Sequence, residues 1–179
     1  MASPVFLLGF MGTGKTTLGR ALEARMPLWR YLDLDDEIQR RAGMSIPRIF
    51  SNYGEKVFRQ MEREALDEVL PLENVIIGCG GGTPCFFDNM DRMNAAGITV
   101  WLQARPDTLL RRLIVAQATR PKLNGMSHSD LEAYIASETA AREPFYSRAR
   151  HTFPSDLLES PAEVEASCRF FIRKFIPEP

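Results

Sequence analysis

The sequence predicts an open α/β fold built on a parallel sheet, and two patterns support this. Five short apolar runs alternate with helical patterns along the 179 residues, as in a chain of strand–helix–strand units. The runs are continuously apolar, which is typical of parallel strands covered by helices on both faces. Because no linker or internal repeat is visible, we expect residues 1–179 to form one domain.

The expected elements follow in order along the chain. The strands are predicted at 5–8, 29–33, 75–78, 98–103 and 151–153. Helical patterns begin at about Thr16, cover much of 35–70, recur near 88–96, and begin again at Pro106, Ser129 and Pro161. Two of these helices carry start signals, since "SDLE" from Ser129 fits a capping box and "SPAE" places a cap at Ser160.

The composition excludes several classes of protein. A net charge of −1 and a pI near 6.2 argue against binding nucleic acid through a basic face. No apolar stretch approaches the length of a membrane span, and the N-terminus lacks the basic region of a signal peptide. The three cysteines have no C-x-x-C spacing, which favours a reducing compartment. We therefore expect a cytoplasmic protein. We also expect it to act on small molecules as a monomer.

The stretch "GFMGTGKT" at residues 9–16 matches the phosphate-loop pattern G-x-x-x-x-G-K-[ST] in full. It lies between a predicted strand and a predicted helix, so its backbone N–H groups can surround phosphate oxygens at the positive end of the helix. Lys15 would place its charge on the β- and γ-phosphates, and the Thr16 hydroxyl could ligate Mg²⁺. The expected ATP-binding residues of this loop are Gly12, Thr13, Gly14, Lys15, Thr16 and Thr17.

Acidic residues follow the second predicted strand in "YLDLDDEI". The carboxyl ends of the strands form the edge of an open α/β sheet where ligands bind. If the segment is extended, Asp33 and Asp35 point to the same side and could divide the work between the metal and an acceptor hydroxyl. Asp36 is expected to be an exposed residue of the next helix. The alternative is that all three acids only cap that helix.

Glycines and arginines also bear on the function. The run "VIIGCGGGTPC" ends its strand in Gly80, Gly81 and Gly82, which suggests that something approaches the main chain closely, although a structural turn is the alternative. Arg59 lies on an amphipathic helix and could be an ordinary surface residue. Arg142 precedes Pro144, near a helix end.

Taken in order, these segments resemble the shikimate kinase family. The quoted motifs are the phosphate loop, "DLD", "IFSNYGEKVFRQME", "GCGGGTP", "TRPKL" and "AAREPFY", which together span essentially the whole chain. The resemblance implies a nucleoside-monophosphate-kinase-like core with strand order 2-3-1-4-5. It also implies a substrate subdomain at about 34–62 and a lid at about 117–128. The activity implied is transfer of the ATP γ-phosphoryl group to the 3-hydroxyl of shikimate in aromatic amino-acid biosynthesis.

The resemblance also assigns roles to residues. Lys15, Asp35 and Arg120 would be catalytic, with Mg²⁺ held by Thr16 and Asp33. The shikimate site would comprise Asp35, Phe50, Phe58, Arg59, Gly80, Gly81, Gly82 and Arg142, although either phenylalanine could be plain core. On the nucleotide side, Arg120 would reach the phosphates from the lid, and Arg112 with Pro161 would enclose adenine.

Two rival functions remain open from the residues. A gluconate kinase shares this core and also takes a carboxylated substrate. A phosphate-loop protein that binds nucleotide without transfer is the second, against which Lys15, Thr16 and Asp33 argue. One departure from the family pattern is Lys122 in "RPKL", where an apolar residue is expected.

Overall fold

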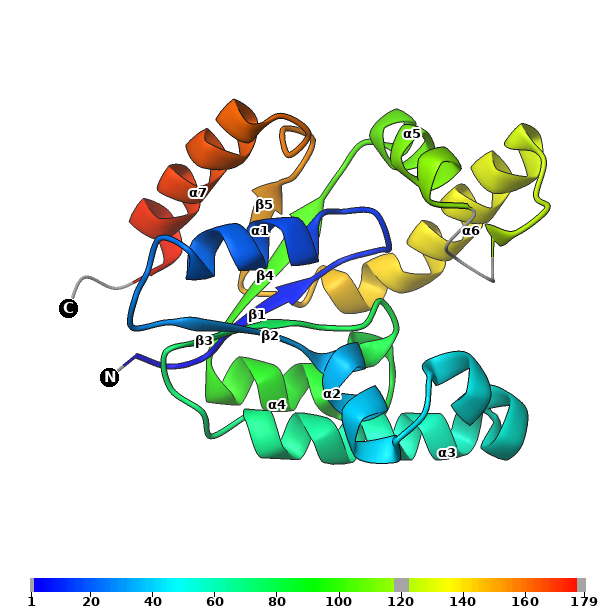
Figure 1. The fold of residues 1–179 in the computed structure, drawn as a ribbon, viewed down its shortest axis with the longest axis horizontal. Helices are drawn as coiled ribbons and strands as arrows, with labels where there is room; N and C mark the ends of the chain where they lie inside the picture. Colours follow the sequence, from blue (N-terminus) through cyan, green and yellow to red (C-terminus); the bar gives the residue numbers. More distant parts are fainter. Residues whose placement is uncertain (1, 118–122, 177–179) are drawn as a thin grey trace.

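The computed structural model describes residues 2–117 and 123–176, and it places all five strands in one parallel sheet (Figure 1). The strands are β1 (Val5–Leu8), β2 (Arg30–Asp33), β3 (Val75–Gly78), β4 (Ile98–Gln103) and β5 (His151–Pro154). Their order across the sheet is β2-β3-β1-β4-β5, and every neighbouring pair is parallel. The predicted fold class and strand order are therefore confirmed.

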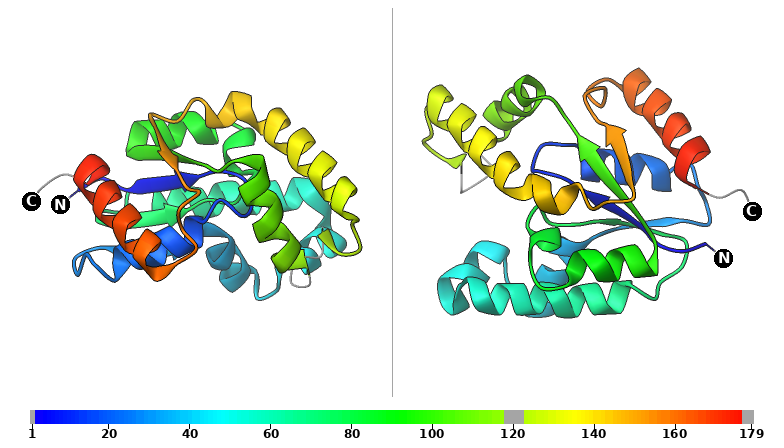
Figure 2. Two further views of the ribbon diagram at one scale, coloured as in Figure 1. Left: turned by 90° about the horizontal axis from the view of Figure 1, so that it is seen from above. Right: turned by 180° about the vertical axis from the view of Figure 1, so that it is seen from behind.

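Helices cover both faces of the sheet, as the continuously apolar strands require. The helices are α1 (Lys15–Glu23), α2 (Leu34–Ala42), α3 (Ile46–Val69), α4 (Asn89–Ala96), α5 (Pro106–Ala116), α6 (His128–Tyr146) and α7 (Pro161–Phe175). Figures 1 and 2 show α1 and α7 on one face and α2, α3 and α4 on the other. Alternate residues of β1 divide between these layers, since Phe6 and Leu8 join one core cluster and Val5 and Leu7 the other.

A third apolar cluster lies beyond the carboxyl edge of the sheet. Leu109 and Leu113 of α5 pack there with Leu131 and Ile135 of α6, around Phe10 of the loop that follows β1. This cluster anchors the α5–α6 pair beside that loop (Figure 2). Within the described residues, no helix combines the length and the apolar character that a membrane crossing requires.

The helix boundaries differ from the sequence predictions in two informative places. Helix α6 is capped by Ser127, whose side chain accepts a hydrogen bond from the Asp130 N–H, so the predicted cap at Ser129 is wrong by two residues. Helix α3 contains Gly54 at φ 78°, where the chain kinks. The cap at Ser160 is confirmed, including the reciprocal bond from Glu163. Residues 118–122 of the predicted lid, which include Arg120 and Lys122, lie outside the described residues.

Candidate active site

The phosphate loop joins β1 to α1, as the motif requires. Gly12 and Gly14 have φ values of 83° and 90°, a region that residues with a side chain rarely adopt. The Lys15 ammonium donates to the carbonyls of Gly9 at 2.7 Å and Phe10 at 3.0 Å, which places its charge within the loop. Because α1 begins at Lys15, the first N–H groups of the helix also face this space.

Thr16 and Asp33 come together at the end of β2. The Thr16 hydroxyl lies 3.4 Å from Asp33 Oδ2, and the Tyr31 hydroxyl donates to the same oxygen at 3.1 Å. The other oxygen, Oδ1, accepts the Asp35 N–H at 3.1 Å, so Asp33 is the N-cap of α2. Burial raises the pKa of Tyr31, and the Asp33 charge adds to this, so Tyr31 keeps its proton.

Asp35 reaches the site in a different way from the one predicted. The strand ends at Asp33 and Asp35 already belongs to the first turn of α2, so the alternation of an extended segment does not apply. Both carboxylates nevertheless line the same cavity. Burial raises the pKa of Asp35 to about 6, and the negative charges of Asp33 and Glu62 act in the same direction, while Lys15 opposes them.

The loop after β3 explains its three glycines. A Cβ atom on Gly80 would lie 2.8 Å from Asp35 Oδ1, and one on Gly82 would lie 2.8 Å from the Arg59 guanidinium. A Cβ on Gly81 would lie 3.1 Å from Arg142 Nη1. Each glycine therefore faces one of three polar side chains from three different helices. The close approach predicted for this loop is present.

Arg59 is held in place and is not an ordinary surface residue. Its side chain is only 12% exposed, and its Nη1 donates to Glu62 Oε2 at 2.8 Å. Its guanidinium also stacks on Phe86, 3.9 Å from the ring centroid. Glu62 is 1% exposed and accepts the Thr83 hydroxyl at 2.6 Å, so one buried carboxylate ties Arg59 to the end of the glycine loop.

Arg142 approaches the same loop from the last turns of α6. It pairs with Glu138 one turn earlier and lies 5.3 Å above the Phe10 ring. Four residues later on the same helix, the buried Tyr146 hydroxyl donates to the Gly81 carbonyl at 2.5 Å. The end of α6 therefore supplies an arginine and fixes the glycine that faces it.

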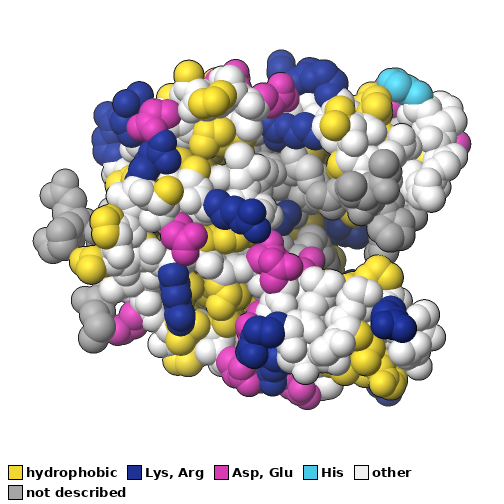
Figure 3. Space-filling view, viewed as in Figure 1, with side chains coloured by type: hydrophobic (Ala, Val, Ile, Leu, Met, Phe, Trp, Pro, Cys, Tyr) yellow, Lys and Arg dark blue, Asp and Glu magenta, His cyan; other side chains and the backbone are white. Residues whose placement is uncertain are grey.

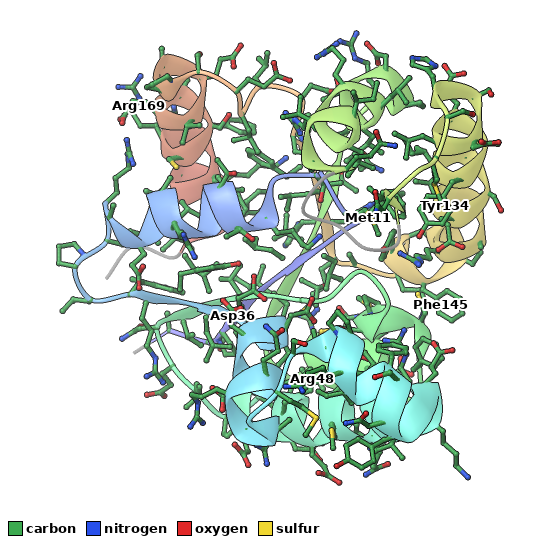
Figure 4. All side chains as sticks on the ribbon, turned by 45° about the vertical axis from the view of Figure 1, so that its right-hand side comes forward. Met11, Asp36, Arg48, Tyr134, Phe145 and Arg169 are labelled. Atoms are coloured by element: carbon green, nitrogen blue, oxygen red, sulfur yellow. The ribbon has the colours of Figure 1, made fainter. Side chains whose placement is uncertain are left out.

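A cavity of about 660 Å³ joins the phosphate loop, the acids and the glycine loop. Its lining includes the predicted residues Gly12, Gly14, Lys15, Thr16, Thr17, Asp33, Asp35, Gly80, Gly81 and Arg112. Figure 3 shows basic and acidic side chains gathered along the hollow that opens between the α5–α6 pair and α2–α3. In Figure 4, Met11 and Asp36, which both belong to the lining, lie on opposite sides of it.

Other predicted residues lie outside this lining. Gly82 belongs to the glycine loop, and Arg59 and Arg142 lie against that loop. Phe50 and Phe58 contact each other with ring centroids 4.6 Å apart. Phe58 is 4% exposed and belongs to the core. The Thr13 side chain is also buried, donates to the Phe10 carbonyl, and lines a second cavity of about 420 Å³.

Of the two residues predicted to enclose adenine, only one lines the large cavity. Arg112 lines the large cavity, where its guanidinium donates to the carbonyls of Gly12, Ser155 and Asp156. Pro161 is exposed at the start of α7 and does not belong to the lining, whereas Leu158 and Glu159 do.

Three polar side chains of the site were not predicted. Tyr31 and Tyr146 each direct a hydroxyl to a site residue, and Glu62 orients Arg59. For Tyr146 and Glu62, helical spacing held a usable signal. Tyr146 follows Arg142 by four residues, and Glu62 follows Arg59 by three, so each pair shares a helix face.

The phosphate loop and the acids can bind a nucleotide's phosphates, while Arg59 and Arg142 bring two guanidinium groups to the glycine loop, where they can bind a small anionic molecule. This arrangement defines a phosphate-loop kinase of small molecules. A family model described as shikimate kinase matches residues 11–172. The shikimate kinase of Phocaeicola vulgatus is 45% identical over 163 residues, covering 91% of this chain and 93% of that protein. The chain belongs to the shikimate kinase family and is an ATP-dependent kinase.

Solved structures agree with that assignment. The crystal structure of shikimate kinase from Bacteroides thetaiotaomicron superposes with a TM-score of 0.91 at 41% identity, covering 96% of this chain and 97% of that one. The Acinetobacter baumannii shikimate kinase, in complex with shikimate, gives 0.82 at 28% identity, covering 97% and 93%. The family assignment thereby decides against gluconate kinase and against a non-catalytic regulator.

Proposed function

We propose that the chain transfers the γ-phosphoryl group of ATP to the 3-hydroxyl of shikimate, giving shikimate 3-phosphate and ADP, with the residues around the large cavity in distinct roles. The observation that carries the proposal is the glycine loop, where Gly80, Gly81 and Gly82 face Asp35, Arg142 and Arg59 respectively. The bare backbone lets these three side chains approach the loop closely, and a small acid bound there would meet two arginines and the carboxylate that acts on its hydroxyl.

The nucleotide side comprises the phosphate loop and its charge. Lys15 lies at the centre of the loop and would hold the β- and γ-phosphates. Arg112, fixed by three carbonyls, would flank the base, with Pro161 at the opening. Arg120 would contact the phosphates from the segment 117–128.

A magnesium ion fits the chemistry of the residues at the end of β2. Thr16 and Asp33 present a hydroxyl and a carboxylate on the cavity wall, and Mg²⁺ prefers such oxygen ligands together with substrate phosphates. These two residues would hold the ion. When bound, it would neutralise charge on the transferring phosphoryl group.

Asp35 would act on the acceptor. The 3-hydroxyl oxygen forms its bond to the γ-phosphorus as the bond to the ADP oxygen breaks, and the hydroxyl proton passes to the Asp35 carboxylate. A pKa near 6 leaves this carboxylate ionised at neutral pH and makes it a better proton acceptor than an ordinary aspartate. In a loose transition state the carboxylate also contributes by orienting the hydroxyl.

Arg59 and Arg142 would grip the shikimate carboxylate by charge-assisted hydrogen bonds. Both guanidinium groups lie against the glycine loop, and both are already held by acidic partners, Glu62 and Glu138. Phe50 and Phe58 would back this part of the site. The proposal also takes the protein to be a monomer in the cytoplasm, where the three cysteines would stay free.

The test is ADP release in a coupled assay with shikimate, with gluconate and with no acceptor. We expect release with shikimate only, and release that does not depend on shikimate would contradict the proposal. Asp35→Asn should lower kcat by at least ~10²-fold. Glu73→Gln, the same loss of one negative charge at an exposed residue outside the cavity lining, should stay within a few-fold of the native enzyme. Equal losses in the two variants would remove the special role of Asp35.

A further inference from the structure

Tyr31 occupies a slot formed by two glycines. Its ring lies between Gly19, inside α1, and Gly78, the last residue of β3. A Cβ atom at Gly19 would overlap the Tyr31 ring at 2.2 Å, and one at Gly78 would overlap its hydroxyl oxygen at 2.3 Å. Glycine is unfavourable inside a helix, and its presence in α1 is explained by the close approach of this ring.

The ring directs its hydroxyl at the Asp33 carboxylate. Tyr31 and Asp33 are two residues apart on β2 and so lie on the same face of the strand. The hydroxyl donates to Asp33 Oδ2 at 3.1 Å, the same oxygen that lies 3.4 Å from Thr16 Oγ1. Together with the Asp35 N–H on Oδ1, both oxygens of Asp33 have donors from the protein.

The hydrogen bond from Tyr31 to Asp33 matters because β2 is an edge strand. In the part of the chain that the structure describes, β2 is at the edge of the sheet and pairs only with β3, so no strand on its other side supports Asp33. A carboxylate at a strand end can rotate about its side-chain bonds unless it is hydrogen-bonded. The bonds to Tyr31 and Asp35 fix the plane of the carboxylate and leave Oδ2 facing Thr16.

We propose that Tyr31 is a positioning residue for magnesium, which holds Asp33 in the orientation that the ion requires. This inference rests on the proposed function, in which Thr16 and Asp33 hold the metal. The alternative is that Tyr31 only fills the space between the two glycines. The two possibilities separate cleanly, because phenylalanine fills the same slot without a hydroxyl.

The experiment compares metal-dependent nucleotide binding in the native protein and Tyr31→Phe. Calorimetry gives the dissociation constant of the β,γ-imido analogue of ATP in excess Mg²⁺ and in excess EDTA. The ratio of the EDTA value to the Mg²⁺ value measures how much the metal strengthens nucleotide binding. Hydrogen-bonding partners of metal ligands typically change metal affinity by 10–100-fold. We expect Tyr31→Phe to reduce the ratio about 10-fold, with the EDTA value within about two-fold of native.

Tyr53→Phe is the matched control, since it removes a tyrosyl hydroxyl from a side chain that is half exposed on α3. Its ratio should equal that of the native protein. A native-like ratio in Tyr31→Phe overturns the inference, and so does an equal loss of affinity with and without metal. Asp33→Asn separates the two proposals. If it also keeps the native ratio, the metal assignment itself is wrong, whereas a loss in Asp33→Asn alone removes only the role of Tyr31.

Discussion

The ionised Asp35 carboxylate should lower the free energy of unfolding of the ligand-free protein above about pH 6, and Asp35→Asn should remove this loss of stability. The folded protein raises the pKa of Asp35 from 3.8 to about 6, chiefly by burial. The shift is roughly 2 units, and at 1.36 kcal/mol per unit it corresponds to about 3 kcal/mol. The acid is thus a large local cost in a protein whose total stability is expected to be about 5–15 kcal/mol.

The sign follows from which state keeps the proton. Between about pH 4 and pH 6 the unfolded chain releases the Asp35 proton while the folded protein retains it, so stability falls as the pH rises. Above about pH 6 the full cost is present. Asparagine carries no charge at any of these values. The stability of Asp35→Asn relative to native should therefore rise from pH 4 to pH 7 by about 3 kcal/mol.

Urea unfolding of the metal- and nucleotide-free proteins at a series of pH values from 4 to 8 measures this difference directly. EDTA is included so that no metal ion binds to Asp33 or Asp35. Glu73→Gln removes one negative charge from an exposed residue outside the site and shows how much of any change comes from net charge alone. A difference between Asp35→Asn and native that is constant with pH, or that falls as the pH rises, would refute the reasoning.

Three further predictions concern the site. Lys15→Ala should lower kcat by ~10³-fold or more, because its charge lies inside the phosphate loop, and near-native turnover would contradict this. Arg59→Ala and Arg142→Ala should each weaken shikimate binding by about 2–5 kcal/mol, seen as a rise of roughly 30-fold or more in the shikimate KM with little change in that of ATP. A larger effect on ATP would reverse the two sites. Tyr146→Phe frees the Gly81 carbonyl and should raise the shikimate KM with native kcat, whereas an unchanged KM would make its hydroxyl dispensable.

The sheet could be predicted because its signals are local. β1 and β3 are continuous apolar runs, and the predicted and observed boundaries of all five strands agree within one residue, as at β2, which begins at Arg30. The cap of α6 was missed because Ser127 and Ser129 both precede acidic residues, and the choice between them depends on where the chain leaves the preceding turn. The kink at Gly54 is invisible in an amphipathic pattern that continues through it.

The site was partly predictable for a similar reason. The phosphate loop and the glycine run can be recognised as contiguous motifs. Glu62 and Tyr146 could be found by their helical spacing from Arg59 and Arg142. The contact of Tyr31 with Gly19 and Gly78 depends on how α1 packs on the sheet, and no pattern within one segment contains it. The wrong geometry for Asp35 arose because the end of β2 coincides with the cap of α2, so one residue serves both elements.

The glycine loop has a consequence for inhibitors and the resistance that follows them. Resistance commonly arises when a mutation removes or enlarges a side chain that an inhibitor contacts but the substrate does not need. At residues 80–82 there is no side chain to remove, and any addition would meet Asp35, Arg142 or Arg59. A compound that binds chiefly through the main chain of this loop would therefore leave the enzyme few escape mutations that do not also damage its own substrate site.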